Sequence, residues 1–220
     1  MKAHAVGLLA AVIVAVGVGE GLTAPKPAEI PTHWQLDASF GDVLPIQLTL
    51  SGERAPRTFW YMRYKITNKT GQERVFVPEF ILYTDTGQLL RAGQQIPSQV
   101  FQAIKEQAND PLLLDLSDVA GKLLQGDENA KDGVAIWADF DPKVASFDVF
   151  VSGLSGETVE IQLPKPIHVT ETDAFGTRVE VVKDKIILAK TLKRHYAISA
   201  DAADRSKTAL QMTEEEWVMR

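Results

Sequence analysis

The residues best placed for covalent catalysis form one short serine-containing motif. Gly153-Leu154-Ser155-Gly156 is close to the sharp turn that presents a nucleophilic serine in many hydrolases. That turn has the spacing G-x-S-x-G and leads from a strand into a helix. Here a glycine follows the serine directly, and a β-rich stretch comes next. We therefore predict a tight turn between two strands at this position.

A carboxylate pair is the second candidate for catalysis. Asp139 and Asp141 lie close together after an apolar run, and two carboxyl groups can share general acid and base work. The sequence positions no nucleophile, base or metal ligand beside them. A hydrolase therefore remains an alternative, whereas the sequence favours a protein without catalytic residues or a cofactor.

Metal binding also has two candidates. The acidic stretch 126–133 has the oxygen-rich composition of a calcium loop, but Lys131 occupies a position where the calcium pattern needs an oxygen donor. Beyond the N-terminal segment, His33, His168 and His195 are too widely spaced to form a ligand pair within one element. We expect a solvated turn at 126–133, with calcium as the alternative, and no metal site.

Charge and composition exclude several classes of function. The 220 residues include 23 Lys and Arg against 29 Asp and Glu, which gives a net charge of −6, and they include no cysteine. A nucleic-acid binder needs a basic surface that displaces phosphate counterions, so we expect no nucleic-acid partner. The lack of thiols excludes disulfides, cysteine-ligated zinc, iron–sulfur clusters and cysteine nucleophiles.

The N-terminal segment predicts export. Residues 5–19 form a run of 15 uncharged, mostly apolar residues after one early lysine. The run is shorter than the roughly 20 residues that span a bilayer, and small and proline residues follow it, as in a signal peptide. We predict a signal peptide over 1–24, or alternatively an uncleaved anchor. The rest of the chain would then be secreted or periplasmic, with membrane contact only through an uncleaved leader.

The elements that must position any site are mostly strands. Apolar and polar residues alternate over 34–40 and 46–51, and the run 59–66 is apolar on both faces. Residues 98–108 differ, because Pro97-Ser98 is a helix start and the apolar residues then fall at helical spacing. The predicted fold is mainly β, an antiparallel β-sandwich with one short helical insert. Further β-type runs lie at 74–77, 80–83, 134–137, 147–151, 159–163, 179–182 and 186–198.

Several short patterns together resemble a known family. They are Trp60-x-x-x-Tyr64-x-Ile66-x-Asn68-x-Thr70-Gly71, Phe80-x-Leu82-x-x-Asp85-x-Gly87, Leu124-x-Gly126-Asp127 and Gly133-Val134-Ala135-Ile136-Trp137. Over residues 34–165 they are similar to the immunoglobulin-like modules of exported bacterial proteins. With the patterns at 153–157 and 217–220, the chain looks most like a group of uncharacterised secreted bacterial proteins. The turn at 85–87 is one residue tighter than the family's usual D-x-x-G, and the helical insert is extra.

The resemblance implies an immunoglobulin-like β-sandwich over 33–165 and a role in binding, anchoring or inhibition. On the residues themselves, Phe59 and Tyr61 lie out of phase with the core-facing side of their strand. Beside Arg63 they would form an exposed patch able to stack on sugar rings, unless the helix near Phe101 covers them. This patch is the first candidate surface.

The second candidate surface lies in residues 166–220, which we expect to form a β extension and tail packed on the sandwich. Lys190 and Arg194 belong to a basic strand, which is either a guarded sheet edge or a docking edge for a partner strand or an acidic polymer. Trp217 lies in an apolar ending that either packs back or meets a partner.

These observations predict an exported, non-catalytic binding or scaffolding protein of the bacterial cell envelope. Its partner would be an envelope protein or a polysaccharide. Inhibition of an extracytoplasmic enzyme through the 126–133 loop and carbohydrate binding are the alternatives, and each makes a different demand on the structure. An inhibitor needs a protruding rigid loop, whereas a binding module needs an exposed patch or sheet edge.

Overall fold

The computed structural model describes residues 24–172, 177–198 and 209–220, so residues 1–23 of the predicted signal peptide lie outside it. The chain is mainly β with antiparallel sheets, as predicted. The strands are β1 (Asp37–Leu48), β2 (Arg57–Thr67), β3 (Arg74–Phe76), β4 (Glu79–Thr84), β5 (Leu89–Arg91), β6 (Gly121–Leu123), β7 (Lys131–Ala138), β8 (Ser146–Ser152), β9 (Thr158–Thr172), β10 (Arg178–Ala197) and β11 (Met212–Met219). The helices are α1 (Ser98–Gln107) and α2 (Leu116–Val119), with a 3-10 turn at Asp127–Asn129.

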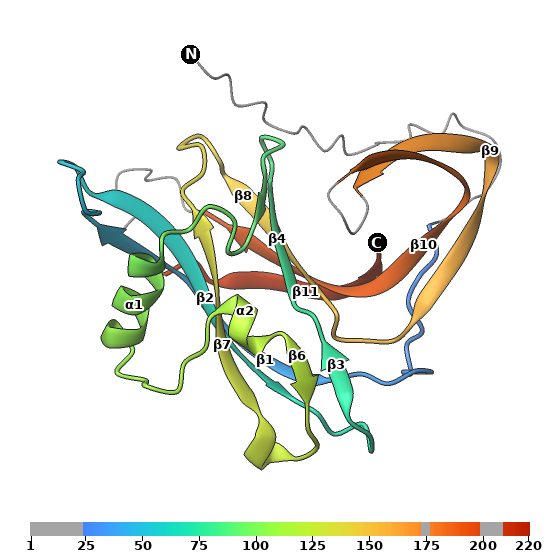
Figure 1. Cartoon of the computed structure of the whole chain (residues 1–220), viewed down its shortest axis with the longest axis horizontal. Helices are drawn as coiled ribbons and strands as arrows, with labels where there is room; N and C mark the ends of the chain where they lie inside the picture. The colour runs from blue at the N-terminus through green and yellow to red at the C-terminus, as the bar shows by residue number, and fades with distance from the viewer. Residues whose placement is uncertain (1–23, 173–176, 199–208) are drawn as a thin grey trace.

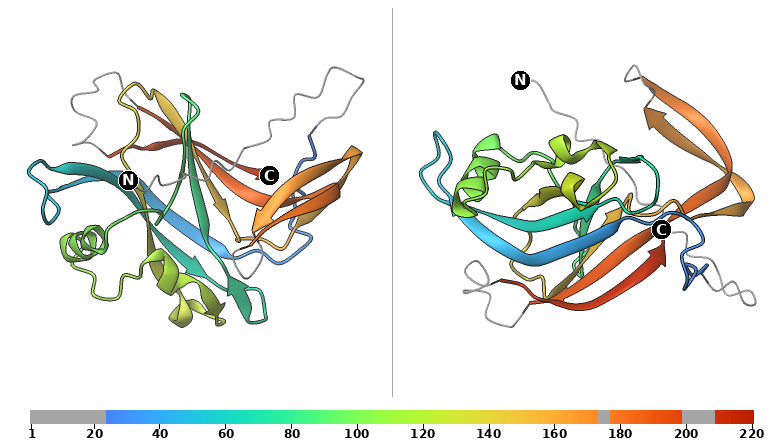
Figure 2. Two further views of the ribbon diagram at one scale, coloured as in Figure 1. Left: turned by 45° about the horizontal axis from the view of Figure 1, so that its top comes forward. Right: turned by 90° about the horizontal axis from the view of Figure 1, so that it is seen from below.

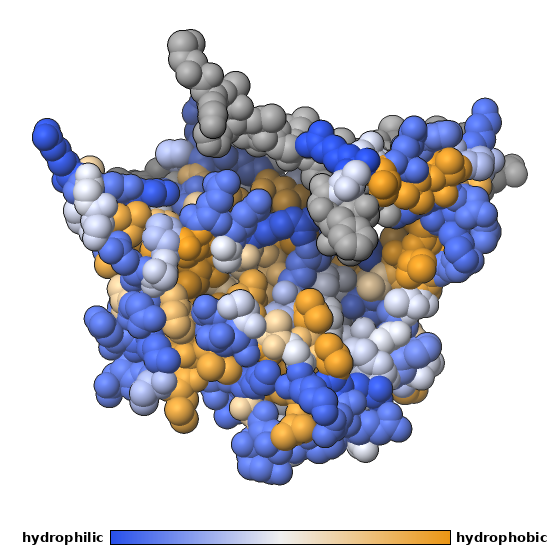
Figure 3. All heavy atoms as spheres, viewed as in Figure 1, coloured by the Kyte–Doolittle hydropathy of each residue, from blue (hydrophilic) through white to orange (hydrophobic). Residues whose placement is uncertain are grey.

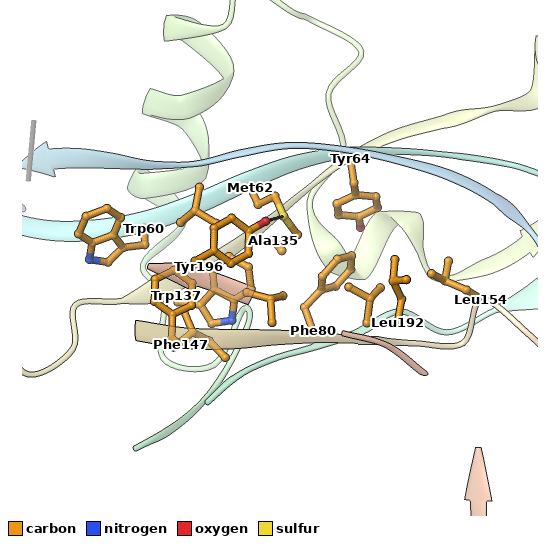
Figure 4. Close-up of a cluster of buried hydrophobic side chains, with 14 of the residues drawn as sticks. Trp60, Met62, Tyr64, Phe80, Ala135, Trp137, Phe147, Leu154, Leu192 and Tyr196 are labelled. Atoms are coloured by element: carbon orange, nitrogen blue, oxygen red, sulfur yellow. Dashed lines mark hydrogen bonds between the residues drawn. The ribbon is translucent and has the colours of Figure 1, made fainter. Parts of the chain in front are cut away.

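Two sheets face each other across the main core (Figures 1 and 2). One has the order β1-β2-β7, and the other has the order β11-β10-β8-β4-β5, with β9 added on β10. Between them, β2 and β7 contribute Trp60 and Trp137, and the facing strands contribute Phe147 and Tyr196 (Figure 4). The Phe147 and Tyr196 rings stack with centroids 5.0 Å apart. Alternating apolar residues from both sheets thus form one continuous core.

A second core lies on the outer face of the β1-β2-β7 sheet, where α1 covers it. Val100 and Ile104 are one turn apart on α1 and pack with Phe59 and Tyr61 of β2. Phe59 is 0% and Tyr61 5% exposed. The helix predicted at 98–108 is confirmed, but the prediction of an exposed patch at Phe59 and Tyr61 is wrong. Arg63 lies farther along the strand and forms an ion pair with Asp110.

The C-terminal strands belong to the larger sheet. β10 pairs with β8 over residues 192–197 and with β11 over residues 190–196. The predicted boundary between 165 and 166 falls inside β9. The C-terminal segment is therefore an integral part of the sheet and not an extension that packs on a completed fold. A further backbone pair, Val43 with Leu210, joins the segment before β11 to the edge of β1.

The paired strands β9 and β10 extend beyond the two-sheet body. Residues 158–172 pair with residues 178–189, and we call this hairpin the ribbon. Figures 1 and 2 show it curving away from the facing sheets. Its register shifts between Lys183 and Lys185, where residues 163–166 of β9 lie opposite Asp184. Such an irregularity bends and twists a strand pair.

Candidate functional site

The serine-containing motif is a structural turn. Gly153 has a φ of 88°, and a Cβ atom there would lie 2.7 Å from the carbonyl oxygen of Val77. Ser155 Oγ donates a hydrogen bond to the carbonyl of Trp34 at 3.3 Å. The turn connects β8 to β9, which confirms the predicted turn between two strands.

The paired aspartates stabilise the turn that follows β7. Asp139 accepts hydrogen bonds from Trp60 Nε1 at 2.8 Å and from the Phe140 N–H at 3.0 Å. Asp141 accepts the Lys143 N–H at 2.8 Å. Both carboxylates thus act as hydrogen-bond acceptors for the local fold, which is a structural role.

The acidic stretch 126–133 is held against its neighbours by ion pairs and hydrogen bonds. Asp127 pairs with Lys69 at 3.1 Å, and Lys131 donates to the Val119 carbonyl at 2.8 Å. His195 lies elsewhere, with its Nδ1 2.7 Å from Asp148 Oδ1. Within the described ranges, no three metal-binding side chains are grouped to hold an ion, and no helix is long and apolar enough to cross a membrane.

Lys190, Glu157 and Trp217 come together at the base of the ribbon. Lys190 Nζ lies 3.1 Å from Glu157 Oε2, and the two side chains are 3% and 9% exposed. The indole of Trp217 lies 5.1 Å from the same ammonium, which adds a cation–π contact. The base of the ribbon therefore contains a buried ion pair.

This ion pair also holds the N-terminal segment 24–31. The Ala28 N–H donates to Glu157 Oε1 at 2.7 Å, and Lys190 Nζ donates to the Ala28 carbonyl at 3.3 Å. The Ala28 hydrogen bond is the largest cause that lowers the pKa of Glu157 below its usual value, against the effect of burial, and Lys190 lowers it further. Glu157 is consequently anionic at neutral pH, and one residue of the segment is fixed through both of its backbone polar groups.

Arg194 is buried beside the same strands. Its Nε donates to Glu215 at 2.9 Å, and its guanidinium lies 5.0 Å from the centroid of the Phe40 ring. On the opposite face, Lys193 pairs with Glu216 at 3.0 Å. The acidic strand β11 therefore neutralises the basic part of β10.

The predicted docking edge at Lys190 and Arg194 is wrong. Arg194 lies between β8 and β11, and Lys190 lies between β11 and the backbone of Glu157. Both cations also have partners within the chain.

The ribbon, in contrast, exposes apolar side chains to solvent (Figure 3). Val182 is 57% and Ile187 64% exposed. The cross-strand pairs of the ribbon include Val169 with Val181, Ile161 with Ile186 and Val159 with Leu188. A two-stranded ribbon buries too little surface to be stable by itself in water. The exposed apolar surface therefore makes the ribbon the candidate site for a partner.

The two long edges of the ribbon differ in sequence. β9 carries Pro164 and Pro166 on either side of Lys165. Proline has no N–H to donate, and both proline and lysine discourage an edge strand from pairing with another chain. β10 has no proline between 178 and 188. The β9 edge thus lacks two backbone donors, whereas the β10 edge keeps all of its N–H groups and carries Lys183 and Lys185.

We predict that Pro164→Thr combined with Pro166→Thr promotes self-association. The β9 edge would regain two N–H donors and could pair with the β10 edge of another copy, a head-to-tail contact that does not close. Sedimentation velocity should show a severalfold rise in oligomer. The matched control replaces the exposed prolines Pro111 and Pro142 by Thr. Equal sedimentation of both double variants would show that the prolines do not guard this edge.

Comparison with known proteins finds no match to a family model, to a curated protein or to a solved structure. The candidate site therefore rests on its own geometry. The ribbon did not emerge from the sequence pattern, because the β-type runs 179–182 and 186–198 read as two strands and the basic residues of the second run suggested the docking edge. The signal was present in residues 179–188, which carry apolar residues on both faces in a segment without proline or glycine.

Proposed function

We propose that this protein is an exported, non-catalytic immunoglobulin-like module that binds a protein partner of the cell envelope through the ribbon. Strand order supports the immunoglobulin-like part of the proposal. In that fold the strands A, B and E share one sheet, and C, F and G share the other. β1-β2-β7 has the chain order of A-B-E, and β10-β8-β4 has that of G-F-C. β5 continues the second sheet beyond C, and β11 is an addition beyond G.

The uncovered apolar ribbon on a fixed base is the observation that carries the binding function. Large apolar residues exposed in a continuous element commonly mark an interaction surface. The buried Lys190 and Glu157 pair and the bound segment 24–31 fix the base of the ribbon on the body. A partner that covered the ribbon would therefore meet a preformed surface and would lose less freedom on binding.

The geometry favours a protein partner over the alternatives. The aromatic patch required for carbohydrate stacking is buried under α1. The 126–133 stretch required for an inhibitory loop is polar, and none of its residues is an exposed large apolar side chain of the kind that the ribbon carries. Export is supported by the composition of residues 1–24, and processing near Ala24 would leave the segment 24–31 at the start of the mature chain.

Site-specific photocrosslinking in producing cells tests this proposal. A photoreactive amino acid placed at Val182 or Ile187 should give a discrete adduct with one envelope protein. The same amino acid at the exposed positions Leu112 and Tyr83, which lie away from the ribbon, should give none. Equal adducts at all four positions, or no adduct at the ribbon, would contradict the proposal. Recovery of the unprocessed chain from the cytoplasm would contradict export.

A further inference from the structure

We infer that the pocket between α1 and α2 binds a small molecule that has an apolar body and a protonated amine. The pocket has a volume of about 430 Å³, which lies within the range of small-molecule sites. It lies on the outer face of the β1-β2-β7 sheet, whereas the ribbon projects from the other side of the body (Figure 1). The inference therefore goes beyond the proposed function and concerns a second binding site.

The floor and walls of this pocket are apolar. Val134 and Ile136 of β7 line it and are 1% and 5% exposed, because they belong to the second core. Phe101 of α1 and Ile96, just before the helix, also line the pocket and pack against that core. Further apolar lining comes from Pro78, Ala92, Pro97 and Leu116. The apolar part of a ligand would therefore be buried against a surface that the fold already holds in place.

One carboxylate supplies the polar contact. Asp115 lines the pocket and is the N-cap residue of α2. Its Oδ1 accepts the Ser117 hydroxyl at 2.7 Å and the Asp118 N–H at 2.9 Å. Its Oδ2 accepts no hydrogen bond from any described residue. The carboxylate therefore keeps one oxygen for a ligand while the other holds the start of α2.

The charge of this carboxylate is not compensated within the part of the chain that the structure describes. No described lysine, arginine or histidine forms an ion pair with Asp115. Lys105 and Lys131 donate to backbone carbonyls instead, at 3.0 and 2.8 Å. Burial raises the pKa of Tyr64, and the negative charge of Asp115 raises it further. A protonated amine would complement this charge and could donate to Oδ2.

The composition of the pocket argues against other classes of ligand. An anion would meet the like charge of Asp115. A metal ion needs several oxygen or nitrogen ligands, whereas the other polar side chains that line the pocket are two serines, Ser98 and Ser117. A wholly polar molecule would leave the apolar floor without a partner. An apolar body that ends in an amine uses both the floor and the carboxylate.

Amide NMR titration of the purified chain tests the inference. The probes are phenylbutylamine, phenylbutanol and phenylbutyrate, which share one apolar body and carry a positive, a neutral and a negative head group at neutral pH. We expect the amine to shift the amide signals of Gly93, Ser98 and Ser117, which line the pocket. It should bind at least tenfold more tightly than the other two probes. Equal affinities, or shifts confined to other parts of the chain, would overturn the inference.

Two substitutions test the two parts of the pocket separately. Asp115→Asn removes the charge and keeps a side-chain oxygen that can cap α2. It should lower the affinity for the amine to that for the alcohol, whereas Asp118→Asn, at an exposed acid outside the pocket, should leave it unchanged.

Ser98→Trp fills the pocket from an exposed position and should abolish binding of the amine. Its matched control is Gln102→Trp, at an exposed position of α1 that does not line the pocket. Circular dichroism confirms that each variant is folded, and the comparison of the three probes on the unaltered chain does not depend on any variant. Full preference for the amine in Asp115→Asn, or undiminished binding in Ser98→Trp, would overturn the inference.

Discussion

Phe59→Ala is expected to lower the free energy of unfolding by about 3–5 kcal/mol, the usual cost of removing a fully buried aromatic side chain. Phe59 has no exposed surface and packs with Val100 and Ile104 of α1. The substitution leaves a cavity between the helix and the sheet that the rigid strand β2 cannot close. Urea titration followed by circular dichroism measures the difference.

The control for this prediction is Tyr83→Ala. Tyr83 is an exposed aromatic residue on β4, and surface substitutions of this kind usually change stability by about 0.5 kcal/mol or less. A similarly small loss for Phe59→Ala would mean that α1 does not cover β2 in solution. The aromatic patch would then be exposed again as a candidate for carbohydrate binding.

Lys190→Met is expected to destabilise the protein by about 3–5 kcal/mol, because it leaves the Glu157 carboxylate buried without its counter-ion. Methionine keeps the unbranched apolar stem of the lysine, so the loss reports the charge and not the volume. The same titration should show that Glu157→Gln, added to Lys190→Met, restores most of the stability, since replacing both partners removes the unpaired charge.

Lys193→Met is the matched control on the same strand. Lys193 pairs with the exposed Glu216, and pairs of this kind contribute about 1 kcal/mol or less. Equal losses of unfolding free energy for Lys190→Met and Lys193→Met would refute a stabilising buried ion pair at the base of the ribbon. Hydrogen exchange of the Ala28 amide gives an independent readout, because its acceptor is the Glu157 carboxylate. We expect faster exchange in Lys190→Met and unchanged exchange in Lys193→Met.

The two predictions bear on the function through different parts of the molecule. If Phe59 belongs to the hydrophobic core, the aromatic patch around it is not available for binding. The case for the ribbon as the binding element is then stronger. If the buried ion pair between Lys190 and Glu157 stabilises the base of the ribbon, the ribbon projects from a rigid base and its partner meets an ordered surface. Lys190, which the sequence suggested as a partner-binding residue, then serves to fix the orientation of the ribbon on the body.

Local features of the fold could be predicted from the sequence because they depend on near neighbours in the chain. Pro97-Ser98 marked the start of α1, and Gly153 required a turn. Period-two alternation located the β conformation of residues 37–40 and 46–48, but it divided the single strand β1 into two. Each of these depends on backbone sterics or on the periodicity of side chains within a few residues. The absence of cysteine and the acidic balance likewise followed from composition alone.

Which elements become neighbours was decided by the tertiary structure. A strand that is apolar on both faces, such as β2, must be buried on both sides. The sequence of β2 does not indicate that α1 is the element that packs on its outer face. The alternation in β10 is similar on either side of Ala189, yet residues 192–196 lie between β8 and β11, whereas residues 178–188 pair with β9 alone among the described residues. Lys190 looked like a surface charge because its partners, Glu157 and Ala28, are distant in the chain. The sequence by itself thus determined the elements and their apolar faces, whereas burial and pairing came from long-range contacts that no local pattern encodes.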